Sequence, residues 1–361
     1  MCGIAGIISL NNSKIDPIVV ENVKRSLEHR GPDHSSHNFI NDSICLIHTR
    51  LSIIDLNNRS NQPFQSADKR YTIVFNGEIY NYKELRKELE TKGYTFITNG
   101  DTEVLLQGYV EYEEKILDKL RGQFAFVIYD NKSGELFMTR DRIGIKPLYY
   151  SVNDSWILFS SELKAIELSK LIKFEADIDS YLAYLRHLCV PADRTGNKNI
   201  NKLEPGQFIR IDKSGLISKK TYWDPYTFSI NNDLNEEIIA NELDRLLNES
   251  VEYRKVSDVE VGLFLSGGLD SSLLGKLMKQ DTETALKAFN VDYKESFDGY
   301  KGELQEARFA SNEIGINLYE QNISFENFKE IFDNYAFYQD DLVGDEVGIP
   351  LYFLAKATKL S

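Results

Sequence analysis

A cysteine directly after the first methionine is the residue with the clearest chemical potential. Cys2 lies between Met1 and Gly3. Because Cys2 is small, Met1 can be removed from it. Removal of Met1 would place a thiol and a free α-amine on one residue. The α-amine has an ordinary pKa of about 7.7–8.0, so it can take the thiol proton near neutral pH. Such a pairing activates a nucleophile. The alternative is a small buried residue at a strand start, since free cysteines are often core residues.

Three polar clusters follow this cysteine, each beside an apolar run. They are residues 29–33 (HRGPD), 50–55 (RLSIID) and 76–81 (NGEIYN). Arg50 can bind a carboxylate through two hydrogen bonds, and Asp101, further along, can bind an ammonium group. Together they could hold the zwitterionic end of an amino acid. The side-chain amide of Asn76 and the backbone N–H of Gly77 could form an oxyanion hole.

Each of these residues also has an ordinary structural interpretation. Arg50 suits a surface salt bridge, Asn76-Gly77 is a common turn dipeptide, and Asp101 suits the N-cap of a helix. Taken singly, the structural interpretations are favoured. Taken together, in this order behind an N-terminal cysteine, the clusters favour a site for nucleophilic hydrolysis.

A glycine- and serine-rich run occupies residues 265–272 (LSGGLDSS). It lies between an apolar segment and a predicted helix, so the helix N-terminus would add about half a positive charge to backbone N–H groups that the glycines let converge. Three serines supply hydroxyl donors: Ser266, Ser271 and Ser272. The run lacks the Gly-Lys-Ser/Thr ending of a Walker A motif. It predicts a phosphate-binding loop, with a serine-capped strand-to-helix turn as the alternative.

The elements that must position the N-terminal clusters are predicted to be strands with helices outside. Apolar runs and turn residues predict strands at residues 3–9, 44–48, 71–75, 124–130, 136–140 and 157–160. Helical periodicity predicts helices at residues 82–91 and 102–112. Residues 1 to about 165 therefore indicate an α+β domain of stacked sheets.

After a polar linker at residues 229–235 (SINNDLN), the pattern changes. An amphipathic helix comes first, with six apolar residues on one face: Ile238, Ile239, Leu243, Leu246, Leu247 and Val251. Strands at 259–265, 286–292 and 317–323 then alternate with helices at 271–279, 304–314 and 350–359, which predicts a parallel sheet. We place the domains at residues 2–185 and 235–361, with a connecting region at 186–234.

Composition limits the classes of partner. The formal net charge is −14, which disfavours nucleic acids and anionic membranes, because both are bound through basic patches. No apolar run reaches the roughly 18 residues of a spanning helix. Three cysteines, Cys2, Cys45 and Cys189, form no disulfide framework, and we expect the last two to be core residues. A cytoplasmic protein that binds neither nucleic acid nor membrane is predicted.

The motifs MCGIAG, HRGPD, RLSIID and NGEIYN, in this order, resemble the glutaminase domain of class II glutamine amidotransferases. The resemblance implies an N-terminal-nucleophile hydrolase with a four-layer αββα sandwich. It implies that Cys2 attacks the side-chain amide of glutamine, that Asn76 and Gly77 stabilise the tetrahedral intermediate, and that water then clears a thioester. The implied glutamine contacts are Arg50, Leu51, Ser52, Ile53, Ile54, Asn76, Gly77, Glu78 and Asp101.

The LSGGLDSS run resembles the pyrophosphate loop of ATP pyrophosphatases, which adenylate a substrate and release pyrophosphate. The implied ATP-binding residues are Leu265, Ser266, Gly267, Gly268, Asp270, Ser271, Ser272 and Val291. Asp270 would also help to hold Mg²⁺, and the backbones of Leu265 and Val291 would hold adenine. A glutaminase followed by this loop resembles glutamine-hydrolysing asparagine synthetases, as do residues 141–150 (DRIGIKPLYY) and 160–165 (SSELKA).

This family resemblance implies ATP-dependent transfer of ammonia from glutamine to aspartate, giving asparagine, AMP, pyrophosphate and glutamate. It leaves a homodimer open. Family members carry a second glycine- and acid-rich loop (SGDGGDE-like) soon after the helix matching residues 350–359, and the sequence contains no such string. We therefore expect an incomplete α/β parallel-sheet domain, as in a synthetase cut partway. Two alternatives stay open: amidation of another carboxylate, such as a sugar acid of a polysaccharide, and glutaminase activity alone.

Overall fold

The computed structural model describes residues 1–191, 193–228, 235–280, 286–294, 302–345 and 347–360. The chain divides into two compact units, Met1–Ser229 with Asp340–Val343, and Ile230–Gln339 with Gly344–Ser361. Of the expected linker at 229–235, only Asn235 lies within the described residues. No helix in the described part of the chain is long and apolar enough to cross a membrane.

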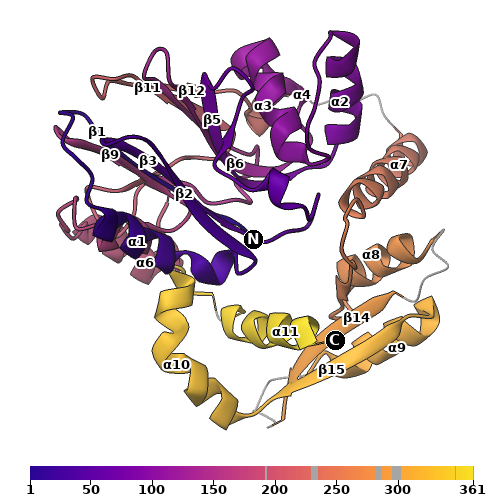
Figure 1. The fold of residues 1–361 in the computed structure, drawn as a ribbon. Helices are drawn as coiled ribbons and strands as arrows, with labels where there is room; N and C mark the ends of the chain where they lie inside the picture. Colours follow the sequence, from indigo (N-terminus) through magenta and orange to yellow (C-terminus); the bar gives the residue numbers. More distant parts are fainter. Residues whose placement is uncertain (192, 229–234, 281–285, 295–301, 346, 361) are drawn as a thin grey trace. The chain divides into compact units, whose positions relative to one another are not determined.

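The first unit contains two six-stranded antiparallel sheets (Figure 1). The first sheet has the order β10-β8-β9-β1-β3-β2 and the second has the order β12-β11-β7-β6-β5-β4. The strands of the first sheet are β1 (Gly3–Ser9), β2 (His34–Asn41), β3 (Ile44–Arg50), β8 (Tyr149–Val152), β9 (Trp156–Ser160) and β10 (Asn201–Lys202). Those of the second are β4 (Phe64–Gln65), β5 (Tyr71–Ile79), β6 (Gly122–Asp130), β7 (Leu136–Arg140), β11 (Gln207–Ile211) and β12 (Ile217–Thr221).

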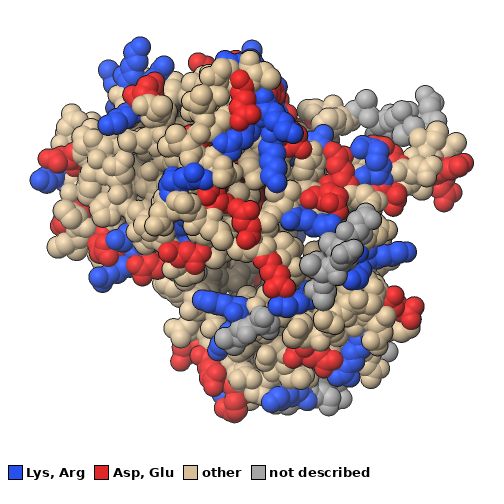
Figure 2. Space-filling model, turned by 45° about the vertical axis from the view of Figure 1, so that its right-hand side comes forward, with Lys and Arg blue, Asp and Glu red and all other residues tan. Residues whose placement is uncertain are grey.

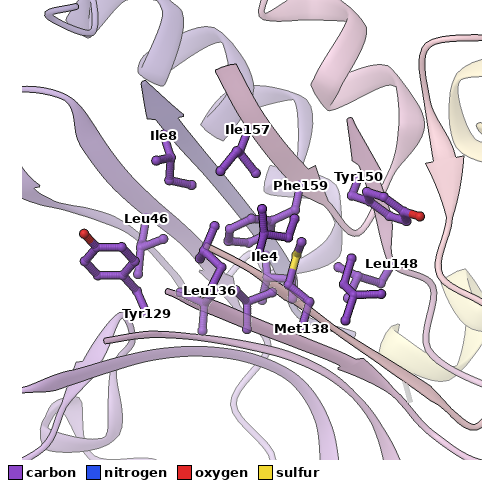
Figure 3. Packing of buried hydrophobic residues seen from close by; sticks show 14 of the residues in the cluster. Ile4, Ile8, Leu46, Tyr129, Leu136, Met138, Leu148, Tyr150, Ile157 and Phe159 are labelled. Atoms are coloured by element: carbon purple, nitrogen blue, oxygen red, sulfur yellow. The ribbon is translucent and has the colours of Figure 1, made fainter. Parts of the chain in front are cut away.

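Helices cover the outer faces of both sheets, as Figure 1 shows. The helices of this unit are α1 (Pro17–Ser26), α2 (Tyr82–Thr91), α3 (Asp101–Tyr112), α4 (Ile116–Lys119), α5 (Leu163–Leu168) and α6 (Ile178–His187). One apolar cluster lies between the two sheets, and Figure 3 shows Ile4, Leu46 and Met138 within it. A second cluster joins the first sheet to α1 and α5. These layers confirm the predicted αββα sandwich.

Strand β1 is central to the first sheet and places the N-terminus. It pairs with β3 on one side and β9 on the other, and all seven of its residues are buried. A side chain at Gly6 would lie 2.2 Å from the ring of Phe159, so only glycine fits there. Because the ladder begins at Gly3 paired with Thr49, Cys2 is held directly at the end of a rigid, two-sided strand.

Strand β5 differs from the prediction in a way that matters for the site. The interpretation of Asn76-Gly77 as a turn is wrong, because β5 continues to Ile79 and stays paired with β6 throughout. Gly77 has a φ of 156° and a side chain there would lie 2.1 Å from the carbonyl oxygen of Gln123. The glycine therefore serves close strand approach.

Of the two cysteines expected in the core, one is there and the other is not. Cys45 is fully buried as predicted, but the core assignment of Cys189 is wrong, because the residue is exposed. Helix α6 ends at His187 and Leu188 adopts a left-handed conformation with φ of 58°, which leaves Cys189 on the surface. Within the expected connecting region, residues 201–221 supply strands β10, β11 and β12.

The second unit contains a three-stranded parallel sheet of order β13-β14-β15. Its strands are β13 (Leu263–Phe264), β14 (Lys287–Tyr293) and β15 (Asn317–Ile323), and its helices are α7 (Glu236–Arg254), α8 (Leu269–Lys279), α9 (Leu304–Ile314), α10 (Phe325–Gln339) and α11 (Gly348–Leu360). The parallel sheet is as predicted. Strand β13 is shorter than expected, because only two of its residues pair with β14.

Helix α7 forms where predicted, but its apolar face is not covered by the described residues. Ile238, Ile239, Leu243 and Leu246 are each about half exposed, whereas Val251 is buried.

Charged side chains of both signs are interspersed over the face of the molecule in Figure 2, rather than gathered by sign.

Candidate active site

A narrow cavity of about 60 Å³ lies where β1 begins. It has room for a handful of waters, which suits a small side chain. Eight of the nine predicted glutamine contacts line it together with Cys2: Arg50, Leu51, Ile53, Ile54, Asn76, Gly77, Glu78 and Asp101. The cavity thus brings together the residues just before β1 with residues from β3, β5 and α3.

The ninth predicted contact, Ser52, is not among the lining residues. Its backbone N–H donates to the carboxylate of Asp33 at 2.7 Å, so the HRGPD cluster anchors the loop that follows β3. Seven lining residues were not predicted: Met1, Ser60, Gln62, Phe75, Gly100, Thr102 and Lys146.

Cys2 sits against the backbone of Leu51. The Leu51 N–H donates to Sγ at 3.4 Å, and Sγ lies 3.7 Å from the Leu51 carbonyl oxygen. Burial raises the pKa of the Cys2 thiol, and the Leu51 hydrogen bond opposes that rise. Burial lowers the pKa of the Met1 amine to about 6. A neutral amine therefore lies beside a thiol that needs a base to become a nucleophile.

Asn76 has the most unusual environment in the cavity. Its side chain is fully buried, and neither Nδ2 nor Oδ1 has a hydrogen-bond partner among the described residues. Each unsatisfied buried polar group costs about 1–3 kcal/mol, so such a group calls for an explanation. A ligand oxygen in the cavity would accept from Nδ2, which is the arrangement of an oxyanion hole.

Asp101 begins helix α3 and faces the same cavity. Burial raises the pKa of its carboxyl to about 7, the hydrogen bond from the Ile79 N–H opposes this, and the charge of Glu78 adds to it. Gly100, not Asp101, is the N-cap of the helix, so the N-cap interpretation is wrong. A buried carboxylate with a second, half-buried carboxylate close by suits a cationic ligand group.

Arg50 is engaged differently from the sequence-based expectation. Its Nη1 donates to the carbonyl of Asn57 at 3.1 Å and to Oδ1 of Asn61 at 2.8 Å. Its Nη2 donates to the carbonyls of Ile54 and Asp55. In this geometry Arg50 holds the loop after β3 in place as a wall of the cavity. To bind a carboxylate through two hydrogen bonds, the guanidinium would have to release these acceptors.

Lys146 is a lining residue that motif spacing did not reveal. It is 6% exposed, and burial lowers the pKa of its amine while the charge of Glu78 opposes this. A lysine within the apolar run Ile145-Lys146-Pro147-Leu148 is the available signal, because buried lysines are rare.

A second, wider cavity of about 520 Å³ lies at the carboxyl ends of β13 and β14 in the second unit. Three of the predicted ATP residues line it: Leu265, Ser266 and Val291. Gly267, Gly268, Asp270, Ser271 and Ser272 are not among its lining residues. The other walls include the rings of Phe289 and Tyr293 and the start of α11. Open parallel sheets bind ligands at this edge.

The LSGGLDSS loop has the form of an anion cradle. Gly267 has φ of 85°, and a side chain there would meet the Glu306 backbone at 2.3 Å. Gly268 caps α8, and Oγ of Ser266 accepts from the Gly268 N–H at 3.2 Å. Oγ of Ser272 is buried without a partner among the described residues. A phosphate at the helix N-terminus would suit these donors.

The backbone of Leu265 is already engaged, since its N–H donates to the Phe289 carbonyl and its carbonyl accepts from Nδ2 of Asn290 at 2.8 Å. No three metal-binding side chains gather anywhere in the described ranges. Asp270 lies in the first turn of α8 and supplies a carboxylate at the start of that helix. Mg²⁺ is commonly held by one or two carboxylates together with substrate phosphates, so this donor set fits it.

Comparison with known proteins matches the two units to two families. Residues 1–223 match the glutamine amidotransferase domain family, and residues 242–361 match the asparagine synthase family. The chain is 36% identical over 99% of its length to glutamine-hydrolysing asparagine synthetase 1 of Bacillus subtilis, of which it spans 56%. It is 33% identical over 99% of its length to a putative glutamine-hydrolysing asparagine synthetase 2 of Methanocaldococcus jannaschii, of which it spans 72%.

Among solved structures, a glutamine phosphoribosylpyrophosphate amidotransferase of Bacillus subtilis is similar with a TM-score of 0.46 and 18% identity. The similarity covers 88% of this chain and 65% of that one.

Proposed function

This chain belongs to the family of glutamine-hydrolysing asparagine synthetases, and from that membership we propose that it releases ammonia from glutamine at Cys2 and transfers it to a carboxylate activated by ATP. We assign glutamine hydrolysis to residues 2–185 and the ATP chemistry to residues 235–361, with residues 186–234 connecting them. The observation that supports the first reaction most strongly is the side-chain amide of Asn76 in the cavity of Cys2, which has no hydrogen-bond partner in the described part of the chain.

The first reaction begins once Met1 has been removed. The α-amine of Cys2 takes the thiol proton while Sγ bonds to the carboxamide carbon of glutamine, and the resulting oxyanion accepts from Nδ2 of Asn76 and the Gly77 N–H. The oxyanion then collapses, the C–N bond breaks, and the amine returns its proton to the leaving nitrogen. Ammonia departs, and water adds to the thioester with the amine as base, giving glutamate and the free thiol.

The charge on Asp101 predicts a pH dependence of glutamine binding. Its pKa is raised to about 7, so the free enzyme holds more of the neutral acid as pH falls below 7, and the glutamine ammonium loses its partner. We expect KM for glutamine to rise as pH falls through 7. Asp101→Asn should raise KM about 10- to 100-fold at pH 8, because a charge-assisted hydrogen bond contributes about 1.5–3 kcal/mol, and should flatten the pH dependence of KM.

This prediction is checked by measuring glutamate release against glutamine concentration from pH 5.5 to 8.5. Asp42→Asn is the matched control, because Asp42 is a surface carboxylate with a side chain 83% exposed. The decline of kcat at low pH should persist in both variants, because it reflects protonation of the α-amine. A KM for Asp101→Asn that still rises below pH 7 would contradict the assignment.

The second reaction uses the loop and the wide cavity of the second unit. Aspartate is the proposed acceptor: its side-chain carboxylate attacks the α-phosphate of ATP, pyrophosphate leaves, and ammonia then displaces AMP to give asparagine. The N–H group at Gly267 and the hydroxyl of Ser272 would hold the phosphates, and the apolar walls at Phe289 would take the base. Bound Mg²⁺ would shield the phosphate charge, with Asp270 as its carboxylate.

The test follows both products in the purified chain. Glutamate is measured with and without ATP, and AMP is measured with aspartate, with a uronic acid and with no acceptor. We expect glutamate that depends on Cys2 and AMP that depends on aspartate. With ammonium chloride in place of glutamine, Cys2→Ala should still form AMP, because the two reactions use separate residues.

The pattern of AMP and glutamate formation distinguishes aspartate from a sugar acid as acceptor, and a synthetase from a glutaminase alone. AMP with a uronic acid and not with aspartate would replace aspartate by a sugar acid. Glutamate without AMP under every condition would leave a glutaminase alone. Absence of Cys2-dependent glutamate would overturn the proposed first reaction.

A further inference from the structure

Four side chains of alternating charge, Arg30, Glu162, Lys164 and Asp340, form a row that begins at the backbone of Cys2. Nε of Arg30 donates to the Cys2 carbonyl oxygen at 2.9 Å, and Nη1 of the same guanidinium donates to Oε1 of Glu162 at 2.9 Å. Cys2 precedes the first ladder pair of β1, Gly3 with Thr49. The Arg30 bond therefore fixes the peptide plane that the β1 ladder does not reach, and with it the direction of the Cα–Cβ bond that bears Sγ.

The row continues from Glu162 to a residue much later in the chain. Nζ of Lys164 forms an ion pair with Oε2 of Glu162 and lies 3.4 Å from Oδ1 of Asp340. The Asp340 carboxylate also accepts from the backbone N–H groups of Leu163, at 2.5 Å, and of Lys164, at 2.9 Å. It thus occupies the N-terminus of α5, where a negative charge is favoured.

All four side chains of the row are largely removed from solvent. Arg30 is 9% exposed, Glu162 5%, Lys164 13% and Asp340 7%. Burial alone would raise the pKa of Glu162, but the hydrogen bond from His29 and the charges of Arg30 and Lys164 lower it to about 2. Glu162 therefore stays ionised, and because its neighbours are screened little by water, a lost charge at one end is felt along the row.

We propose that Glu162 and Asp340 are positioning residues for Cys2, acting through Lys164 and Arg30. The inference rests on the proposed glutamine hydrolysis and adds two residues to its machinery. Asp340 balances the Lys164 ammonium. Without that balance, Lys164 draws more strongly on Glu162 and pulls it from Arg30, and the guanidinium loosens its hold on the Cys2 carbonyl. A nucleophile displaced by even 1 Å can lose about 100-fold in rate.

Asp340 is notable for where it lies in the sequence. It directly follows helix α10 of the second unit, and the short segment Asp340–Val343 packs with the first unit before the chain returns at Gly344. Its neighbour Asp341 also binds the first unit, through Nζ of Lys202 at 2.9 Å and the Tyr149 hydroxyl at 3.1 Å. Within the described residues these contacts of Asp341 do not lead to Cys2, which makes it a control on the same segment.

The test compares Asp340→Asn with Asp341→Asn in the full chain, because both remove one charge and keep the side-chain shape. We expect Asp340→Asn to lower kcat for glutamine about tenfold with KM unchanged within twofold. Asp341→Asn should keep kcat within twofold of the wild type. Adding Lys164→Met to Asp340→Asn should restore kcat to within about threefold, because it removes the ammonium that Asp340 balances. A merely structural role would give no such rescue.

A second readout does not need glutamine turnover. The rate of Cys2 alkylation by iodoacetamide, followed by mass spectrometry relative to exposed Cys189, should fall in Asp340→Asn and in Glu162→Gln and recover in the Lys164→Met double variant. Should the wild type release no glutamate, the proposed function fails, while alkylation still tests the positioning. Equal alkylation in Asp340→Asn and wild type, or an equal kcat loss in Asp341→Asn, would overturn the inference. If Asp340→Asn does not fold, Glu162→Gln decides.

Discussion

Replacement of Cys2 by alanine is expected to abolish glutamine hydrolysis. The thiol is the one group in the narrow cavity that can form the thioester, and loss of a catalytic nucleophile typically costs about 10⁴-fold or more in kcat. The fold should tolerate the change, because Cys2 lies outside the ladder of β1 and the Arg30 bond goes to its backbone carbonyl. The measurement is glutamate release under saturating glutamine, with the thermal midpoint recorded for each variant.

The matched control is Cys189→Ala, which removes an exposed thiol of the same unit. It should keep both kcat and the thermal midpoint of the wild type. Hydrolysis by Cys2→Ala above about 1% of wild type would show that another group attacks glutamine. Mass spectrometry of the wild-type N-terminus belongs to this experiment, because a retained Met1 would leave the α-amine on the wrong residue.

Replacement of Asn76 by alanine is expected to lower kcat for glutamine about 10²- to 10³-fold with little change in KM. The reason is that one oxyanion-hole donor contributes about 2.7–4 kcal/mol, and only in the transition state. The same variant should not lose stability. Its wild-type amide is buried without partners in the described residues, so its removal relieves a penalty of about 1–3 kcal/mol that offsets the small void.

Asn81→Ala provides the contrasting control. Nδ2 of Asn81 donates to the Lys119 carbonyl at 2.9 Å, and its Oδ1 accepts from the Arg121 N–H at 2.9 Å. This variant should lose about 1–3 kcal/mol of unfolding free energy in urea while it keeps kcat. Were Asn76→Ala instead the less stable and Asn81→Ala the less active, the oxyanion role would be wrong.

Local sequence patterns predicted most elements of the first unit. Helix α2 has the predicted bounds because Leu85 and Leu89 repeat on one face and Gly93 follows. The Asn76-Gly77 dipeptide was compatible with a turn because the same two residues occur both in tight turns and in strands where a glycine permits close contact with the neighbouring strand. Only the partner strand β6, some fifty residues away in sequence, distinguishes them.

The site was partly predictable for the same reason. Motif order brought Cys2, Asn76 and Asp101 to one cavity, but the engagement of Arg50 depends on carbonyl groups whose direction no spacing reveals. Lys146 and Glu162 lie far from Cys2 in the sequence, so their places near the cavity are seen only in the folded structure. The exposure of the apolar face of α7 among the described residues could not be foreseen either, because periodicity indicates an apolar face and not its partner.

The central place of β1 has a consequence for the order of events during synthesis. This strand leaves the ribosome well before its neighbour β9, which ends at Ser160. At about 5–20 residues per second, the sheet cannot close around β1 until roughly 10–30 s later. Until then the N-terminus is not held by the complete sheet, so an aminopeptidase has that interval to expose Cys2. Maturation and folding thus compete in time, and the late arrival of β9 favours maturation.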